Sequence, residues 1–119
     1  MPAHVILVAE DEPLLRMSMI MALEEAGFDA VGARNAREAI TVLEMRPDIR
    51  LIFTDVDMGK GEDGLWLASQ VRDRWPPVLI IVTSGHHHVS TEMMPQGARF
   101  FAKPYSVDQI IGQIRELAA

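Results

Sequence analysis

The 119-residue sequence contains no cysteine and few aromatic residues (6%), and its 11 Lys and Arg are outnumbered by 17 Asp and Glu. Without cysteine, disulfides and thiol chemistry are excluded. A formal net charge of -6 and the lack of a basic stripe argue against direct binding of nucleic acid. No apolar run approaches a membrane span, and no charged-then-apolar leader opens the chain. We therefore expect a soluble cytoplasmic protein with no membrane partner.

What is present is typical of one globular domain. Hydrophobic residues make up 49% and charged residues 24%, and the length fits a single domain over residues 1–119. Short apolar runs alternate with amphipathic helical patterns, which predicts an α/β fold with a parallel sheet covered on both faces. The predicted strands are residues 4–9, 28–32, 51–54, 78–83 and 99–102.

Helix start and stop signals support this division. Pro13 suits a first helical turn, and Glu12 beside it suits the helix dipole as a first-turn acid. Asn35 with Glu38, and Ser106 with Gln109, resemble capping pairs. The segment 84–96 carries little periodicity, so any helix there should be short. Its histidines 86–88 favour a solvated loop, with a pH-sensitive loop or a metal site as weaker alternatives.

Unusual polar side chains follow four of the five predicted strands. Glu10 and Asp11 follow the first, Asp55 the third, Thr83 ends the fourth, and Lys103 follows the fifth. Ligands of parallel α/β sheets bind at the carboxyl ends of the strands, so these groups are expected to meet. Carboxylates there suit a nucleophile or Mg²⁺ ligands, and a lysine and a hydroxyl suit phosphoryl oxygens.

The segments VILVAEDE, LIFTDVDM, VLIIVTSG and FFAKPY, in this order and spacing, resemble the receiver domain of bacterial two-component response regulators. The resemblance covers essentially the whole chain. It implies a flavodoxin-like, doubly wound (βα)5 fold with strand order 2-1-3-4-5. It also implies a phosphoacceptor signalling domain, which is not a turnover enzyme, that receives a phosphoryl group from a sensor histidine kinase or phosphotransfer protein.

The resemblance further assigns roles to residues of the metal site. Asp55 is the expected phosphoacceptor and also a metal ligand. Asp11 is expected to ligate Mg²⁺ directly, Glu10 through water, and Asp57 through its backbone carbonyl.

Other roles concern the phosphoryl group and the response to it. Thr83 is expected to hydrogen-bond one phosphoryl oxygen and Lys103 to pair with another, with a cis peptide bond before Pro104. Phe100 matches the aromatic switch position that responds with Thr83. Without the resemblance, Thr83 reads as an ordinary strand residue, Lys103 as a solvated edge lysine and Phe100 as a core aromatic.

The sequence departs from the family pattern in the loop 59–64, where Gly59 replaces a common proline and the loop is one residue longer, and in the segment 84–96. Both departures concern phosphoryl lifetime and partner geometry. A chain ending in its last helix favours a stand-alone domain, monomeric or weakly dimeric, acting through an unidentified downstream protein.

Three other functions remain open. Asp55 and Asp57 resemble the DxD motif of haloacid-dehalogenase-like phosphatases, although that motif should follow an early strand. A receiver-fold scaffold without phosphorylation is a second alternative. A flavin-binding module is disfavoured because the acids 10–12 would repel a phosphate.

Overall fold

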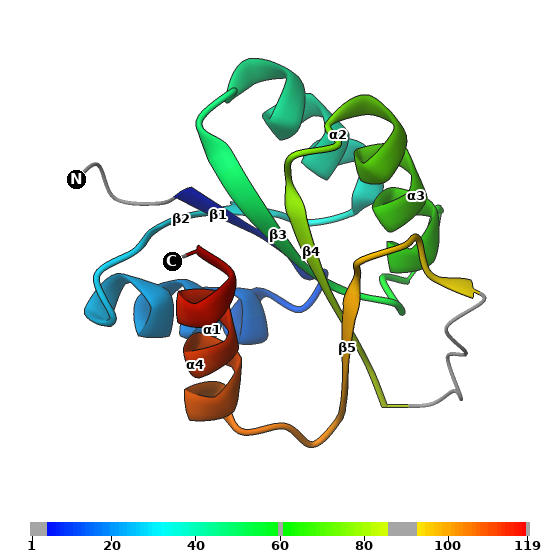
Figure 1. Cartoon of the computed structure of the whole chain (residues 1–119). Helices are drawn as coiled ribbons and strands as arrows, with labels where there is room; N and C mark the ends of the chain where they lie inside the picture. The colour runs from blue at the N-terminus through cyan, green and yellow to red at the C-terminus, as the bar shows by residue number, and fades with distance from the viewer. Residues whose placement is uncertain (1–4, 60, 86–92, 119) are drawn as a thin grey trace.

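A computed structural model describes residues 5–59, 61–85 and 93–118 of the chain (Figure 1). Its centre is a five-stranded parallel sheet in the order β2-β1-β3-β4-β5, which confirms the predicted fold class. The strands are β1 Val5–Ala9, β2 Asp29–Ala33, β3 Ile49–Asp55, β4 Leu79–Ser84 and β5 Arg99–Ala102.

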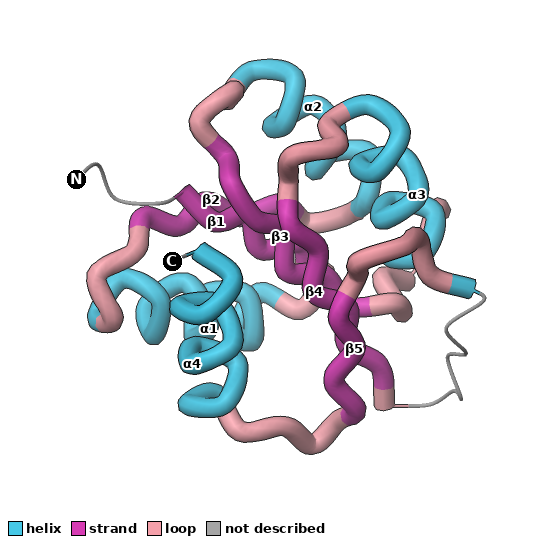
Figure 2. Tube along the Cα trace, viewed as in Figure 1, coloured by secondary structure: helices cyan, strands magenta, loops and turns pink. Residues whose placement is uncertain are grey.

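Helices cover both faces of the sheet. They are α1 Pro13–Glu25, α2 Ala36–Met45, α3 Gly64–Arg74 and α4 Val107–Ala118. The helices α1 and α4 lie on one face and α2 and α3 on the other (Figures 1 and 2). The described residues between β4 and β5 hold no α-helix, so the fifth helical segment expected in 84–96 is not seen there. The three histidines fall outside the described residues.

Capping side chains set the helix starts. Pro13 occupies the first turn of α1 as predicted, but Glu12 is the N-cap itself and accepts from Leu14 N at 3.4 Å. Glu12 therefore precedes the first turn instead of belonging to it. Its side chain satisfies a free N–H at the helix start directly, in addition to any interaction with the helix dipole. Asn35 Oδ1 accepts from Glu38 N at 2.8 Å, which confirms the predicted cap of α2.

Both faces of the sheet are buried, so its central strands read as continuous apolar runs. All five residues of β1 are buried. Along β3, side chains alternate between two cores: Ile52 packs beneath α2 and α3, and Phe53 packs beneath α1 and α4. None of the helices in the described ranges has the length and apolar character needed to cross a lipid bilayer.

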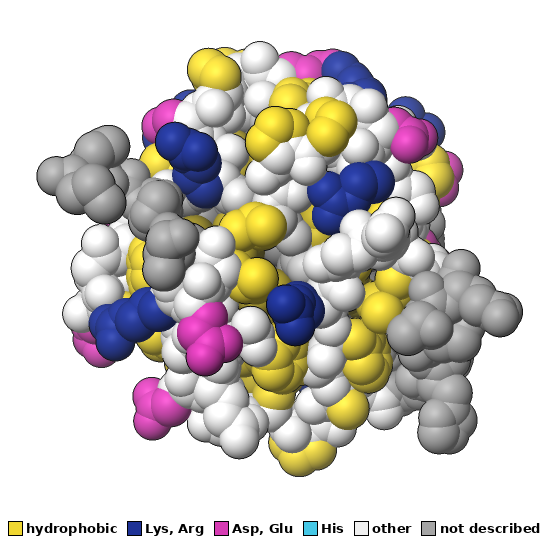
Figure 3. Space-filling model, viewed as in Figure 1, with side chains coloured by type: hydrophobic (Ala, Val, Ile, Leu, Met, Phe, Trp, Pro, Cys, Tyr) yellow, Lys and Arg dark blue, Asp and Glu magenta, His cyan; other side chains and the backbone are white. Residues whose placement is uncertain are grey.

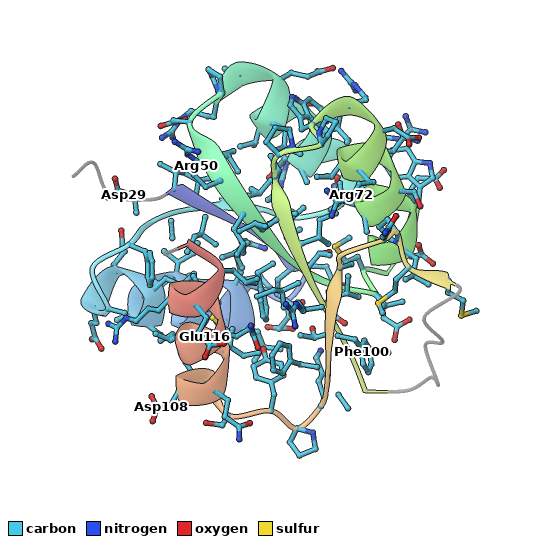
Figure 4. The ribbon with its side chains drawn as sticks, viewed as in Figure 1. Asp29, Arg50, Arg72, Phe100, Asp108 and Glu116 are labelled. Carbon is cyan, nitrogen blue, oxygen red and sulfur yellow. The ribbon has the colours of Figure 1, made fainter. Side chains whose placement is uncertain are left out.

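The strand register aligns the carboxyl ends. Ala9 pairs with Thr54, Asp55 with Thr83, and Ser84 with Ala102. The residues that follow these positions are therefore brought to one edge. Figure 4 labels Asp29 and Arg50 near the amino ends of β2 and β3, away from this edge.

The outer surface carries charges of both signs. On the face in Figure 3, Lys and Arg side chains are interspersed with Asp and Glu, and no basic stripe crosses it.

Candidate functional site

Asp55 ends β3 and is buried, with 6% of its surface exposed. Its Oδ2 accepts a hydrogen bond from Lys103 Nζ at 2.7 Å. Its Oδ1 is also buried but has no hydrogen-bond partner among the described residues. Buried carboxylate oxygens are normally satisfied, so this oxygen marks a position for a ligand.

Lys103 lies just after β5 and reaches Asp55 from the edge of the sheet. Its backbone N donates to Ser84 O at 3.0 Å, and the following bond to Pro104 is cis, as expected. Burial opposes the charge on Lys103, but the hydrogen bond to Asp55 and the charge of that carboxylate outweigh burial, so the pKa of Lys103 is raised. The lysine is therefore a fixed positive charge beside Asp55.

Three carboxylates gather at this edge. Glu10, Asp11 and Asp55 each contribute one oxygen, and these oxygens all lie within 4.8 Å of one another. Glu10 is only 7% exposed, and its Oε2 accepts from Glu12 N at 3.1 Å. Burial raises the pKa of Glu10 to about 7 against the effect of this backbone hydrogen bond, with contributions from Asp11 and the charge of Asp55. Folding thus brings three carboxylates close together, and a bound cation would offset the repulsion between them.

The donor set fits Mg²⁺. That ion prefers oxygen ligands and is usually held by one or two carboxylates together with phosphate oxygens and water. Glu10, Asp11 and Asp55 supply oxygen ligands only, and the unpartnered Oδ1 of Asp55 belongs to the same cluster. Three of the residues predicted to hold the metal are therefore brought together, and the role of the Asp57 carbonyl stays a prediction.

Thr83 lies beside the phosphoacceptor candidate in the neighbouring strand. It is 1% exposed, and its Oγ1 has no partner among the described residues. Thr83 therefore places a second unsatisfied polar atom next to Asp55, to which it is paired in the sheet. The Thr83 hydroxyl can donate a hydrogen bond to an oxygen of a ligand, whereas the unpartnered Asp55 oxygen can only accept, so it suits a cation or an electrophilic centre.

Phe100 and Asp57 lie outside this cluster. Phe100 is half-buried on β5 (Figure 4) and packs against the core beneath α2 and α3. The sheet pairs Phe100 with Val82 and pairs Thr83 with Phe101. Asp57 is exposed, two residues beyond β3. Their expected roles in switching and metal binding remain predictions.

Three residues near the site were not predicted. Arg16 Nη1 donates to Glu10 O at 2.8 Å and fixes the backbone at the end of β1. Thr54 Oγ1 donates to Asp55 O at 2.9 Å, and Gly64 begins α3 directly against that carbonyl. The only hint in the sequence was Gly64, which closes a glycine-rich loop.

An apolar groove of about 550 Å³ opens next to the cluster, between α1 and the connection from β5 to α4. Leu15 and Met19 of α1 form part of its lining, and Lys103 and Tyr105 form another part. Lys103 lines this groove and also contacts Asp55, so the groove and the carboxylate cluster lie on either side of the same lysine.

The chain matches the family described as "Response regulator receiver domain" over residues 6–115. It is 33% identical over 117 residues to the transcriptional regulatory protein PdtaR of Mycobacterium tuberculosis, covering 95% of this chain and 55% of the relative. It is also 33% identical over 114 residues to the nitrogen assimilation regulatory protein NtrX of Azorhizobium caulinodans, covering 92% and 25%. The chain thus spans about half or less of these relatives' own length.

Solved structures give the same result. A response regulator receiver protein from Sinorhizobium medicae superposes with a TM-score of 0.88 at 27% identity, covering 97% of this chain and 94% of that one. One from Pseudomonas putida gives 0.88 at 29% identity, with 98% of each chain covered. The family match, the strand order and the carboxylate cluster agree, and the chain belongs to the receiver domain family of response regulators.

Proposed function

We propose that Asp55 accepts a phosphoryl group from a phosphohistidine of a sensor histidine kinase or phosphotransfer protein. The observation that carries this proposal is the buried, unpartnered Oδ1 of Asp55 within the carboxylate cluster, beside Lys103. A carboxylate that only stabilised the fold would have both oxygens satisfied.

The proposed transfer follows from this geometry. A carboxylate oxygen of Asp55 attacks the phosphorus, the P–N bond breaks, and the histidine nitrogen keeps the bonding electron pair. Lys103 neutralises charge on the transferring oxygens, and the Thr83 hydroxyl donates to one of them. Mg²⁺, held by Glu10, Asp11 and Asp55, would supply further charge neutralisation.

The groove beside Lys103 supports a protein donor. Leu14 and Leu15 of α1 are 73% and 54% exposed, and Leu15 lines the groove. Exposed apolar side chains around a concave site are typical of a surface that another protein covers. A donor protein seated on this groove would lie beside Lys103, which contacts Asp55.

The proposed output is a regulated contact rather than catalytic turnover. Phosphorylation adds charge at Asp55, to which Thr83 and, through β5, Phe100 respond. The chain would catalyse its own phosphorylation from a donor and would lose the phosphoryl group by hydrolysis. Asp57 and the loop 59–64 would affect the lifetime of the phosphoryl group on Asp55. We place this activity in the cytoplasm, with an unidentified downstream protein as partner.

The experiment is intact-mass measurement after incubation with acetyl phosphate, with and without Mg²⁺. The wild type should gain one phosphoryl group in a Mg²⁺-dependent way, and Asp55→Asn should gain none. Asp57→Asn is the matched control, because it removes a nearby exposed carboxylate and should still be modified.

Two outcomes would contradict the proposal. A wild type that binds Mg²⁺ but never gains a phosphoryl group, and does not respond to beryllofluoride, would support a scaffold. Multiple turnover of a phosphate ester that stops in Asp57→Asn would support the phosphatase alternative.

A further inference from the structure

Thr54 is fully buried one residue before the proposed phosphoacceptor. Side chains alternate along β3, and Ile52 and Val56 belong to the core beneath α2 and α3, so Thr54 faces α3. Its hydroxyl donates to the backbone carbonyl of Asp55 at 2.9 Å, while the Met58 sulfur lies at 3.9 Å. The shorter contact takes the single hydroxyl proton.

The same peptide unit is also held at its other end. Val56 N donates to Thr83 O at 2.8 Å, so the carbonyl of Asp55 and the N–H that follows it both have partners. Because a peptide unit is planar, rotation about the Asp55 backbone would break both hydrogen bonds together.

Gly64 closes the remaining space around this carbonyl. A Cβ added to Gly64 would lie 2.1 Å from Asp55 O and 3.0 Å from Thr54 Oγ1. Gly64 N donates to Val56 O at 2.9 Å, which fixes the start of α3 against the end of β3. The carbonyl thus lies between a hydroxyl and the helix start.

We propose that Thr54 is a positioning residue for Asp55, acting through the backbone carbonyl. The orientation of the carboxylate depends on the backbone that carries it, and reactions at an oriented nucleophile are sensitive to displacements of about 1 Å. This proposal rests on Asp55 being the phosphoacceptor. No substrate or metal contact by Thr54 is required.

Two substitutions separate the hydroxyl from the volume of the side chain. Thr54→Val keeps the volume and removes the donor, whereas Thr54→Ser keeps the donor and removes a methyl group. A residue needed only for packing would tolerate valine better than serine. If Thr54 positions Asp55, the serine variant should instead be phosphorylated faster than the valine variant.

The test measures the melting temperature, the Mg²⁺ affinity by calorimetry and the rate of phosphorylation by acetyl phosphate. For Thr54→Val we expect a rate about tenfold below wild type and weaker Mg²⁺ binding. For Thr54→Ser we expect a rate within about twofold of wild type, despite a lower melting temperature.

Wild-type rate and Mg²⁺ affinity in Thr54→Val would overturn the inference. So would losses in both variants that follow their melting temperatures. A wild type that gains no phosphoryl group would instead refute the proposed function. In that case the Mg²⁺ affinities still decide whether Thr54 orients the carboxylate, since Asp55 belongs to the cation cluster.

Discussion

Glu10 makes the stability of the fold depend on pH in the direction opposite to that of most carboxylates. Its pKa is raised from an ordinary value of 4.5 to about 7, chiefly by burial. Between these values the folded state keeps a proton that the unfolded state has lost, so stability falls as pH rises. At roughly 1.4 kcal/mol per pKa unit, ionised Glu10 destabilises the metal-free fold by about 3 kcal/mol above pH 7.

Glu10→Gln removes this titration while keeping the side-chain shape and its acceptor for Glu12 N. We expect urea denaturation in chelator to show a wild-type free energy of unfolding that drops by about 3 kcal/mol, relative to the variant, between pH 4.5 and 8. Excess Mg²⁺ should reduce the difference at high pH, because a bound cation favours the ionised carboxylate.

Comparison with the variant cancels the titration of groups that do not interact with Glu10, such as Glu38 and Asp48, whose pKa values are lowered by neighbouring arginines. A difference between wild type and Glu10→Gln that stays constant from pH 4.5 to 8 would refute the reasoning. It would mean that folding does not raise the pKa of Glu10.

Two further predictions concern stability. Without Mg²⁺, Asp11→Ala should raise the melting temperature by about 2–4 °C, because it relieves repulsion between the carboxylates of the cluster. The variant should also lose the stabilisation that Mg²⁺ gives the wild type. A melting temperature below that of the metal-free wild type would contradict this prediction. Gly64→Ala should lower the free energy of unfolding, measured by urea denaturation, by at least about 2 kcal/mol, because the added Cβ would lie 2.1 Å from a backbone oxygen. In the control Gly112→Ala the added Cβ would meet no atom within 4 Å, so this variant should be as stable as wild type or more stable.

Much of the site was predictable because parallel sheets obey simple geometry. Runs such as residues 51–54 are continuous and apolar because both faces of β3 are buried. The polar residue that ends each run must then lie at the carboxyl edge. The strand order implied by the family resemblance makes β3, β4 and β5 neighbours, which brings Asp55, Thr83 and Lys103 together. Among the strands only the boundaries moved, as with β2, predicted at 28–32 and found at Asp29–Ala33.

The supporting residues were not predictable, because their roles depend on close approach between distant backbones. Arg16 reaches Glu10 O only because its side chain passes Gly32, where a Cβ would lie 3.0 Å from Arg16 Cδ. On a helical pattern Arg16 reads as one more solvated charge. Likewise, Thr54 reads as a common strand residue, and its bond to Asp55 O depends on the local backbone at the end of β3.

The lysine that partners Asp55 lies 48 residues further along the chain. On the ribosome, synthesis proceeds from the N-terminus, so the three carboxylates emerge well before β5. Until Lys103 has been added, the nascent domain carries an acidic edge without its internal countercharge. The residue that directly follows the last strand of the sheet therefore changes the electrostatics of the nascent chain, because it supplies a positive charge to this acidic edge.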